Sequence, residues 1–253
     1  MSKAKQRILL LGGTGDARRL AARLVDWPDL TVISSLAGRT RDANRPAGDV
    51  RIGGFGGAVG LTRYLEEAAI DAVIDATHPY AAEISANAAQ ACTASGRPLL
   101  TLLRLPWNQQ PGDRWIDVAD AAQAAERLSA LGPRVFLTLG QKDLAPFAAC
   151  TGCRFLVRTI EQPTSLPLTN ADVIVGRGPF DGAAELELME RHAITGLVSK
   201  NSGGDATYGK IEAARHLLLP VVMIARPPRT EGAVAETEEE VFTWLRAWPD
   251  RPA

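Results

Sequence analysis

The sequence has little of several features that define common protein classes. Its 253 residues carry a formal net charge of only −1, so it lacks the broad basic surface typical of nucleic-acid binding. No stretch approaches the roughly 18 consecutive apolar residues of a membrane-spanning helix. The amino terminus, MSKAKQRILLLGG, lacks the small-residue cleavage site of a signal peptide. We therefore expect a cytoplasmic protein that binds neither nucleic acid nor a membrane.

Cysteine is scarce as well. The three cysteines, Cys92, Cys150 and Cys153, form no disulfide framework. The motif CTGC has the spacing of a redox pair, but such a pair gains thiolate character at the start of a helix, whereas this one follows a helix-like segment, DLAPFAAC. A zinc site needs two more ligands at a suitable spacing, and we find none. The sequence therefore predicts no redox centre and no metal site.

The chain is rich in apolar, β-type segments that alternate with helical patterns. This alternation predicts an α/β protein with mainly parallel sheets, and nearly continuous apolar segments suit strands that are covered on both faces. The expected strands are residues 7–11, 30–34, 50–52, 71–76 and 98–104, and then 115–118, 134–139, 154–159, 172–176, 196–200 and 220–225.

A polar segment divides this series into two halves. Residues 105–115, LPWNQQPGDRW, contain two prolines and a glycine and read as a linker. We therefore expect two domains, residues 1–105 and 106–253. The second ends in an amphipathic helix at 236–248.

The first strand is followed by a glycine turn, GGTGDARRLA, that opens a helix. Ligands of open parallel sheets bind beyond the carboxyl ends of the strands, and glycines with a helix N-terminus suit a phosphate group. Gly13 and Gly15 fit the dinucleotide fingerprint, but Arg18 stands at its third glycine position. A tight turn without a ligand remains the alternative. The candidate cofactor-binding residues here are Gly12, Gly13, Thr14, Gly15 and Asp16.

The segment after the second strand, SSLAGRT, indicates which dinucleotide is bound. NAD-binding proteins usually place an acidic residue here, whereas this chain offers Ser34, Ser35, Gly38 and Arg39. NADPH is therefore the expected cofactor, although an exposed Arg39 without a ligand is the alternative. The glycines at 53–60, Gly54 among them, either pass close to a dinucleotide or form the turn into the next helix.

The motif DATHPYA, at 75–81, follows the fourth strand. Pro79 suits the first turn of a helix, and Thr77 or His78 could cap it. Capping does not account for Asp75, His78 and Tyr80 together, so we predict a wall of the nicotinamide pocket. A structural role for His78 remains open. The candidate residues of this wall are Thr77, His78, Pro79 and Tyr80.

The second half has its own polar loops after the strands, at 140–144, 176–180 and 199–210. The last, SKNSGGDATYGK, combines cations, hydroxyls and exposed amides, as an anion site requires. A solvated glycine-rich loop is the alternative. Its candidate binding residues are Lys200, Asn201, Ser202, Gly203, Gly204, Thr207 and Lys210.

These segments resemble the precorrin-6A reductases of cobalamin biosynthesis. The matching pieces span most of the chain: LLLGGTGDA, SSLAGR, the glycines at 53–60, IDATHPYA, GPF, VSKNSGG with Thr207, KIEAAR and PVVMIARP. DATHPYA followed by SKNSGG is a specific pairing that a generic dinucleotide-binding protein would not carry.

The resemblance implies two Rossmann-like three-layer domains, with NADPH and a tetrapyrrole-derived substrate in an interdomain cleft. It implies that one double bond of precorrin-6A is reduced to give precorrin-6B, with a hydride added to one carbon and a proton to its neighbour. The candidates for the many substrate carboxylates are Arg104, Lys142, Lys200 and Lys210. Tyr80, His78 or a bound water would deliver the proton. We expect a monomer.

Two alternative functions make different demands on the sequence. A short-chain dehydrogenase relies on a Tyr-x-x-x-Lys pair, but the residues four after Tyr64, Tyr80 and Tyr208 are Ala68, Ile84 and Glu212. A non-catalytic NADP-sensing regulator would not need the basic loop at 199–210. Steady oxidation of NADPH in the presence of the precorrin would exclude such a regulator.

Overall fold

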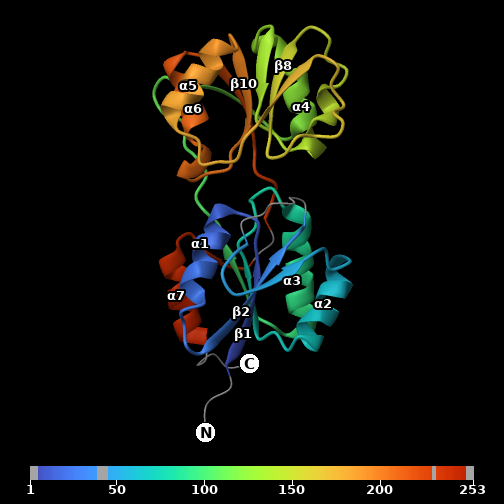
Figure 1. The fold of residues 1–253 in the computed structure, drawn as a ribbon, viewed down its shortest axis with the longest axis vertical. Helices are drawn as coiled ribbons and strands as arrows, with labels where there is room; N and C mark the ends of the chain where they lie inside the picture. The colour runs from blue at the N-terminus through green and yellow to red at the C-terminus, as the bar shows by residue number, and fades with distance from the viewer. Residues whose placement is uncertain (1–4, 39–44, 230–231, 249–253) are drawn as a thin grey trace. The chain divides into compact units, whose positions relative to one another are not determined.

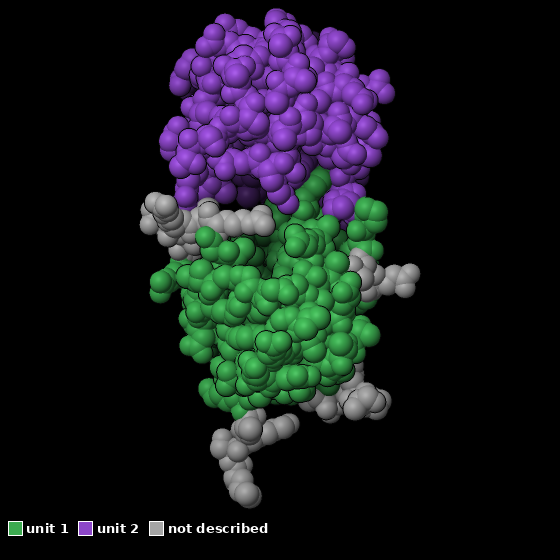
Figure 2. All heavy atoms as spheres, turned by 90° about the vertical axis from the view of Figure 1, so that its right-hand side faces the viewer, with its two compact units in different colours: residues 1–104, 228–253 green, residues 105–227 purple. Residues whose placement is uncertain are grey.

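The computed structural model describes residues 5–38, 45–229 and 232–248. It divides the chain into two compact units (Figure 2). Unit 1 comprises residues 1–104 and 228–253, and unit 2 comprises residues 105–227. In the described part of the chain, no helix is long and apolar enough to cross a membrane.

Unit 1 is built on a six-stranded parallel sheet with helices on both faces (Figure 1). From one edge to the other, its strands are β12 (Ala233–Ala235), β5 (Leu99–Leu102), β4 (Ala72–Asp75), β1 (Gln6–Leu11), β2 (Leu30–Leu36) and β3 (Asp49–Ile52). The helices α1 (Gly15–Leu24) and α7 (Glu238–Ala247) cover one face, and α2 (Gly57–Glu67) and α3 (Ala82–Ser95) cover the other.

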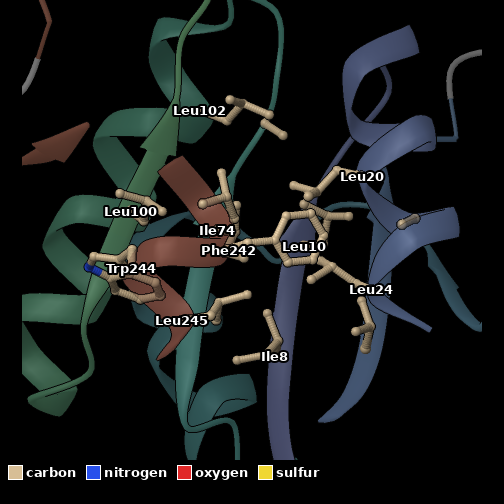
Figure 3. Close-up of a cluster of buried hydrophobic side chains, with 14 of the residues drawn as sticks. Ile8, Leu10, Leu20, Leu24, Ile74, Leu100, Leu102, Phe242, Trp244 and Leu245 are labelled. Carbon is tan, nitrogen blue, oxygen red and sulfur yellow. The ribbon is translucent and has the colours of Figure 1, made fainter. Parts of the chain in front are cut away.

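The central strand β1 is buried on both faces, which explains its unbroken apolar sequence. Ile8 and Leu10 point towards α1 and α7, where they meet Leu20 and Phe242 among others (Figure 3). Leu9 packs on the opposite face, against residues of α2 and α3. Each fully buried side chain of this size contributes about 2 kcal/mol. The core therefore fixes β1, and with it the start of the glycine turn.

Unit 2 repeats this architecture with a second six-stranded parallel sheet. In spatial order its strands are β6 (Arg114–Val118), β11 (Pro220–Ile224), β10 (Gly196–Lys200), β7 (Arg134–Leu137), β8 (Arg154–Thr159) and β9 (Ala171–Val175). The helices α5 (Gly182–Arg191) and α6 (Gly209–His216) cover one face, and α4 (Ala121–Glu126) lies on the other (Figure 1). Short 3-10 helices occupy Leu128–Ala130, Gln141–Asp143, Ala145–Phe147 and Asp205–Thr207.

Both sheets follow the Rossmann strand order 3-2-1-4-5-6, but their sixth strands are exchanged along the chain. β6 comes directly after β5 of unit 1, yet it pairs with β11 in unit 2. β12 comes after β11 of unit 2, yet it pairs with β5 in unit 1. The sheet of unit 1 is therefore completed by a strand that follows unit 2 in the chain, whereas the sheet of unit 2 is completed by the strand that precedes its other five.

The predicted α/β fold with two parallel-sheet units is confirmed, and each of the eleven expected strand segments overlaps one strand of the structure. The expected limits of the second domain, 106–253, differ from the observed units, because residues 228–253 belong to unit 1. The predicted closing helix exists as α7, but it packs on the sheet of unit 1.

One local prediction is wrong. The segment DLAPFAAC reads as a helix, but the structure has a 3-10 helix that ends at Asp143 and another at Ala145–Phe147. Pro146 lies in the first turn of the second one. Proline has no N–H to continue a helical ladder beyond its first turn. Cys150 and Cys153 are free thiols that follow these turns and precede β8.

Candidate functional site

Each sheet has one point at which its strand order reverses: between β1 and β4 in unit 1, and between β7 and β10 in unit 2. Open α/β sheets bind their ligands beyond the carboxyl ends of the strands at this switch point. In unit 1 the glycine turn and residues 76–81 follow the two strands. In unit 2 residues 138–142 and 201–208 do so. Most of the predicted site residues therefore lie at these two edges.

The glycine turn after β1 is shaped for the approach of a ligand. Gly13 has a φ of +109°, which favours glycine, and a Cβ atom placed there would meet nothing within 4 Å. The Thr14 hydroxyl accepts a hydrogen bond from the Ala17 N–H at 3.0 Å and caps α1. The N–H groups of Gly15 and Asp16 precede the first hydrogen bond of this helix. Such donors at a helix start suit a phosphate group.

The same threonine connects the glycine turn to the next strand of the switch point. Its Oγ1 donates a hydrogen bond of 2.8 Å to the Ala76 carbonyl oxygen, just beyond β4. Gly12 continues the sheet, because its N–H bonds the Ser35 carbonyl oxygen at 3.0 Å. The turn is therefore held by both strands that flank β1.

Asp16 adds a negative charge to the first turn of α1, and two arginines offset it. The Arg104 Nη1 atom lies 2.6 Å from Asp16 Oδ2, and the Arg19 Nη2 atom lies 2.6 Å from Asp16 Oδ1. The sequence predicts that Arg104 binds the substrate. In the structure its guanidinium lies at the glycine turn, with about a fifth of the side chain exposed.

The loop after β4 is organised by Asp75, which is only 2% exposed. Its Oδ1 accepts hydrogen bonds from the Thr77 N–H at 3.0 Å and the Thr77 hydroxyl at 2.6 Å. Its Oδ2 accepts one from the Ser85 hydroxyl at 2.5 Å. Burial, and then the nearby Asp75, raise the pKa of Cys92 to about 12. Cys92 is therefore a protonated core residue. Asp75 and Ser85 are absent from the predicted set, although Asp75 opens the motif.

The expected capping of the next helix by this motif is wrong. α3 begins at Ala82, so Pro79 precedes the helix, and neither Thr77 nor His78 caps it. Instead, the His78 carbonyl oxygen accepts the Ala81 N–H at 2.7 Å. The His78 Nδ1 atom accepts the Tyr80 N–H at 3.3 Å, and the two rings lie 5.6 Å apart. His78, Pro79 and Tyr80 are all partly exposed at the carboxyl edge of the sheet.

The serines after the second strand are not loop residues. β2 continues to Leu36, and Ser34 and Ser35 are 1% and 6% exposed. The Ser34 hydroxyl is buried and has no hydrogen-bond partner among the described residues. Gly38 is exposed, and Arg39 lies outside the described residues.

The glycines after β3 are held by Arg51, a residue that the sequence did not single out. Its guanidinium donates to the carbonyl oxygens of Gly53 at 2.5 Å and Gly54 at 2.8 Å, and it lies 3.8 Å from the ring centre of Phe55. A Cβ atom at Gly60 would lie 1.8 Å from the Phe55 carbonyl oxygen, so this glycine serves the turn. At Gly54 a Cβ atom would meet nothing within 4 Å. The role of Gly60 is therefore structural, and the approach of a dinucleotide to Gly54 stays a prediction.

In unit 2, an ion pair spans the switch point. The Lys200 Nζ atom, at the end of β10, lies 2.6 Å from Asp143 Oδ2, in the loop after β7. Lys142 is exposed and Thr207 is partly exposed, whereas Ser202 and Gly203 are buried. The polar atoms of the Asn201 side chain bond the backbone of Trp107.

Among the predicted substrate-binding residues, Lys210 has the surroundings that differ most from the prediction. It is only 6% exposed, and its ammonium lies 5.4 Å from the ring centre of Trp107. Burial lowers its pKa to about 8, while Glu185 opposes and Arg158 adds to this effect. Arg158 and Glu185 form a buried ion pair at 2.5 Å, with side chains 10% and 3% exposed. The sequence predicts a cation that meets the substrate. The structure has a cation inside unit 2.

A hollow in the surface of unit 2, lined by Gly152, Cys153, Arg154 and Asn170, lies at the amino ends of β8 and β9. This is the edge of the sheet opposite to the switch point. The Cys153 thiol donates weakly to the Gly132 carbonyl oxygen at 3.6 Å, and burial raises the pKa of Cys153. Among the described residues, no group of three or more His, Cys, Asp or Glu side chains could hold a metal ion. The hollow therefore offers no evident chemistry.

Two Rossmann-ordered sheets, a capped glycine turn and polar loops at both switch points define an α/β protein with the Rossmann-type arrangement. The family model described as "Precorrin-6x reductase CbiJ/CobK" matches residues 7–246. The chain belongs to this family, whose members are oxidoreductases that act on precorrins in cobalamin biosynthesis.

Individual relatives agree over nearly the whole chain. The precorrin-6A reductase of Rhodococcus erythropolis is 50% identical over 222 residues, which cover 88% of this chain and 90% of the relative. The precorrin-6A reductase of Rhodobacter capsulatus is 42% identical over 240 residues, which cover 94% and 95%. The solved structure of a CobK precorrin-6A reductase superposes with a TM-score of 0.91 at 42% identity, covering 95% of this chain and 96% of that one.

Proposed function

We propose that the protein uses NADPH to reduce one carbon–carbon double bond of precorrin-6A, giving precorrin-6B. The observation that carries the proposal is the capped glycine turn at the switch point of unit 1, in a chain 50% identical to a precorrin-6A reductase. A glycine turn alone is a weak signal. The strand order and the family membership make it specific.

The residues of unit 1 fit a dinucleotide. The open space at Gly13 and the N–H groups at the start of α1 suit the diphosphate. Arg104 and Arg19 both pair with Asp16 and so offset its negative charge at the start of α1. The segment SSLAGRT at the end of β2 contains no acidic residue that would repel the 2′-phosphate of NADPH. We assign Arg39 to this phosphate on the sequence alone.

NADPH would supply the hydride, so the protein's own contribution is mainly orientation, which is worth roughly 7–11 kcal/mol in favourable cases. Thr77, His78, Pro79 and Tyr80 are assigned to the nicotinamide end of the cofactor, because their loop is tied to the glycine turn. Tyr80 or His78, both partly exposed there, would hold the proton that completes the reduction.

The polycarboxylate substrate is assigned to the carboxyl edge of unit 2. Lys142 is exposed there and Lys200 lies at the end of β10. Cations at a strand edge meet carboxylates through charge-assisted hydrogen bonds. A cleft in which both units meet one macrocycle stays a prediction of the resemblance, as do the monomeric state and the cytoplasmic location.

The test is turnover by the purified chain. Precorrin-6A with NADPH should give loss of absorbance at the nicotinamide band, and a product heavier by two hydrogens. NADH at the same concentration should react much more slowly. Binding of NADPH without turnover would contradict the proposal and favour the NADP-sensing regulator.

A further inference from the structure

Trp107 lies in the segment that reads as a linker, but it is a buried residue of unit 2, only 8% exposed. Its backbone N–H donates to Asn201 Oδ1 at 2.7 Å, and Asn201 Nδ2 donates to its carbonyl oxygen at 2.9 Å. One side chain amide therefore completes a closed pair of hydrogen bonds with one backbone unit. This geometry fixes Asn201 directly beyond β10.

The indole of Trp107 contacts the same loop further along. Its Nε1–H donates to the Gly204 carbonyl oxygen at 2.8 Å. Its ring lies 5.6 Å from the Tyr208 ring and 5.4 Å from the Lys210 ammonium. The buried Lys210 is thus part of the packing around Trp107.

The neighbours of Trp107 and Asn201 leave the loop little freedom. Gly203 has a φ of +69°, and a Cβ atom there would lie 2.1 Å from the Leu105 carbonyl oxygen. On another side, Arg226 donates to the carbonyl oxygens of Asn201 at 2.8 Å and Ser202 at 3.1 Å. Residues 201–204 are therefore held between residues 105–107 and Arg226.

We propose that Trp107 and Asn201 are positioning residues, which hold residues 202–204 in the form that receives a carboxylate of the tetrapyrrole substrate. This inference rests on the proposed function. It changes the predicted role of Asn201. The side-chain amide of Asn201 bonds Trp107, so Asn201 acts on the substrate indirectly, by holding the backbone of the loop. The carboxylate is met at Gly204, the partly exposed glycine of this loop, since backbone N–H groups in a glycine turn form an anion site.

The test compares two tryptophans of unit 2. Trp107→Phe keeps an aromatic ring but removes the hydrogen bond to Gly204. Trp115→Phe is the matched control, because the Trp115 Nε1 atom is buried and has no hydrogen-bond partner among the described residues. We expect Trp107→Phe to raise the KM for precorrin-6A about two- to tenfold, the equivalent of one hydrogen bond, with kcat and the Kd for NADPH within about twofold of wild type. Trp115→Phe should leave all three within about twofold.

Asn201→Asp provides a second variant if Trp107→Phe does not fold. Its carboxylate still accepts from the Trp107 N–H but faces the Trp107 carbonyl oxygen with a second acceptor. We expect a KM increase at least as large as that of Trp107→Phe. Equal KM values for Trp107→Phe and Trp115→Phe, or a loss of NADPH affinity at unchanged KM, would overturn the inference.

Amide hydrogen exchange separates this inference from the proposed function. Residues 201–208 should exchange faster in Trp107→Phe than in Trp115→Phe, whether or not substrate turns over. If the two variants differ in this way but the wild-type protein shows no turnover, the proposed function and the substrate role are refuted, while the role of Trp107 in holding the loop is supported. Wild-type turnover with identical exchange in the two variants refutes the positioning role alone.

Discussion

The Thr14 hydroxyl donates a hydrogen bond to the Ala76 carbonyl oxygen, and this contact joins the two loops of the switch point in unit 1. The same hydroxyl accepts the Ala17 N–H and caps α1. One side chain thus sets both the start of the helix and the position of the loop after β4. A cofactor that spans the two loops depends on that spacing.

Thr14→Val tests this contact, because valine keeps the shape of threonine and removes both hydrogen bonds. We expect the free energy of unfolding to fall by about 1–2 kcal/mol, and the affinity for NADPH to fall about tenfold. Denaturant unfolding and fluorescence titration measure these two quantities. Thr14→Ser keeps the hydroxyl and should behave as wild type. NADPH affinity that is unchanged in Thr14→Val would contradict a role of this turn in binding the cofactor.

Asp75→Asn should loosen the loop that carries His78 and Tyr80. The buried carboxylate accepts three hydrogen bonds, and an amide replaces one acceptor oxygen by a donor that faces Thr77 or Ser85. We expect a loss of about 2–3 kcal/mol in unfolding free energy, and a kcat at least about tenfold lower, since orientation dominates the proposed chemistry.

The matched control for Asp75 is Asp71, which lies just before the other end of β4 and accepts the Arg7 N–H at an exposed position. Asp71→Asn should leave kcat unchanged. An equal loss of kcat in both variants would show that the loop after β4 has no special role.

Glu185→Gln should destabilise unit 2 strongly. It leaves the Arg158 guanidinium buried between aromatic rings, 3.9 Å from the Phe180 ring centre, without its carboxylate partner. Removing one partner of a buried ion pair lowers the unfolding free energy by about 3–5 kcal/mol. Asp172→Asn breaks the exposed pair with Arg154 and should change little. Chemical denaturation of both variants makes the comparison, and similar midpoints would contradict the burial of the first pair.

Lys210 predicts a specific dependence of stability on pH. Its pKa is lowered from 10.5 to about 8 in the folded state. Between these values the unfolded chain holds a proton that the folded chain has released, so the unfolding free energy rises with pH. Below about pH 8 both states are protonated and the contribution is constant.

Lys210→Met removes this contribution. Measured against that variant, the wild type should gain roughly 2–4 kcal/mol in unfolding free energy between pH 8 and 10.5. Unfolding experiments on both proteins at several pH values test this. The other lysines and the tyrosines are the same in both proteins, so their titration cancels in the difference. A constant difference between the two proteins would show that Lys210 titrates normally.

Arg39→Ala tests the choice of cofactor, on the basis of the acid-free segment after the second strand. The KM for NADPH should rise about tenfold or more, because a charge-assisted contact to the 2′-phosphate is lost. The KM for NADH should change little. Equal effects on the two cofactors would exclude the assignment of Arg39 to the 2′-phosphate.

The central strands were predictable because they are buried on both faces. Ile8 and Leu9 point to opposite helix layers, so an unbroken apolar segment is required there. The glycine turn was predictable for a related reason, since its backbone conformation demands glycine at Gly13. Both features depend on residues that are neighbours in the chain, so they can be inferred from the sequence.

Contacts between distant segments were not predictable in this way. β12 has only three residues, and its pairing with β5 is set by the packing of α7 on unit 1. Trp107 stands among prolines and polar residues, so its surroundings indicate a linker, while its partners Asn201 and Gly204 lie almost a hundred residues away. The hydroxyls of Ser34 and Ser35 are typical of a ligand-binding loop, but both residues belong to the end of β2.

Because β12 and α7 follow unit 2 in the chain, residues 1–104 do not form a self-sufficient unit. A fragment that stops at Arg104 would leave β5 as an open edge and would lack Phe242, Trp244 and Leu245, which fill the core beside Ile8 (Figure 3). A fragment that starts after β6 would expose β11 in the same way. Unit 1 could therefore not be transferred as one continuous segment, whereas unit 2 is continuous from residue 105 to residue 227. Nascent unit 1 cannot finish folding until α7 has left the ribosome.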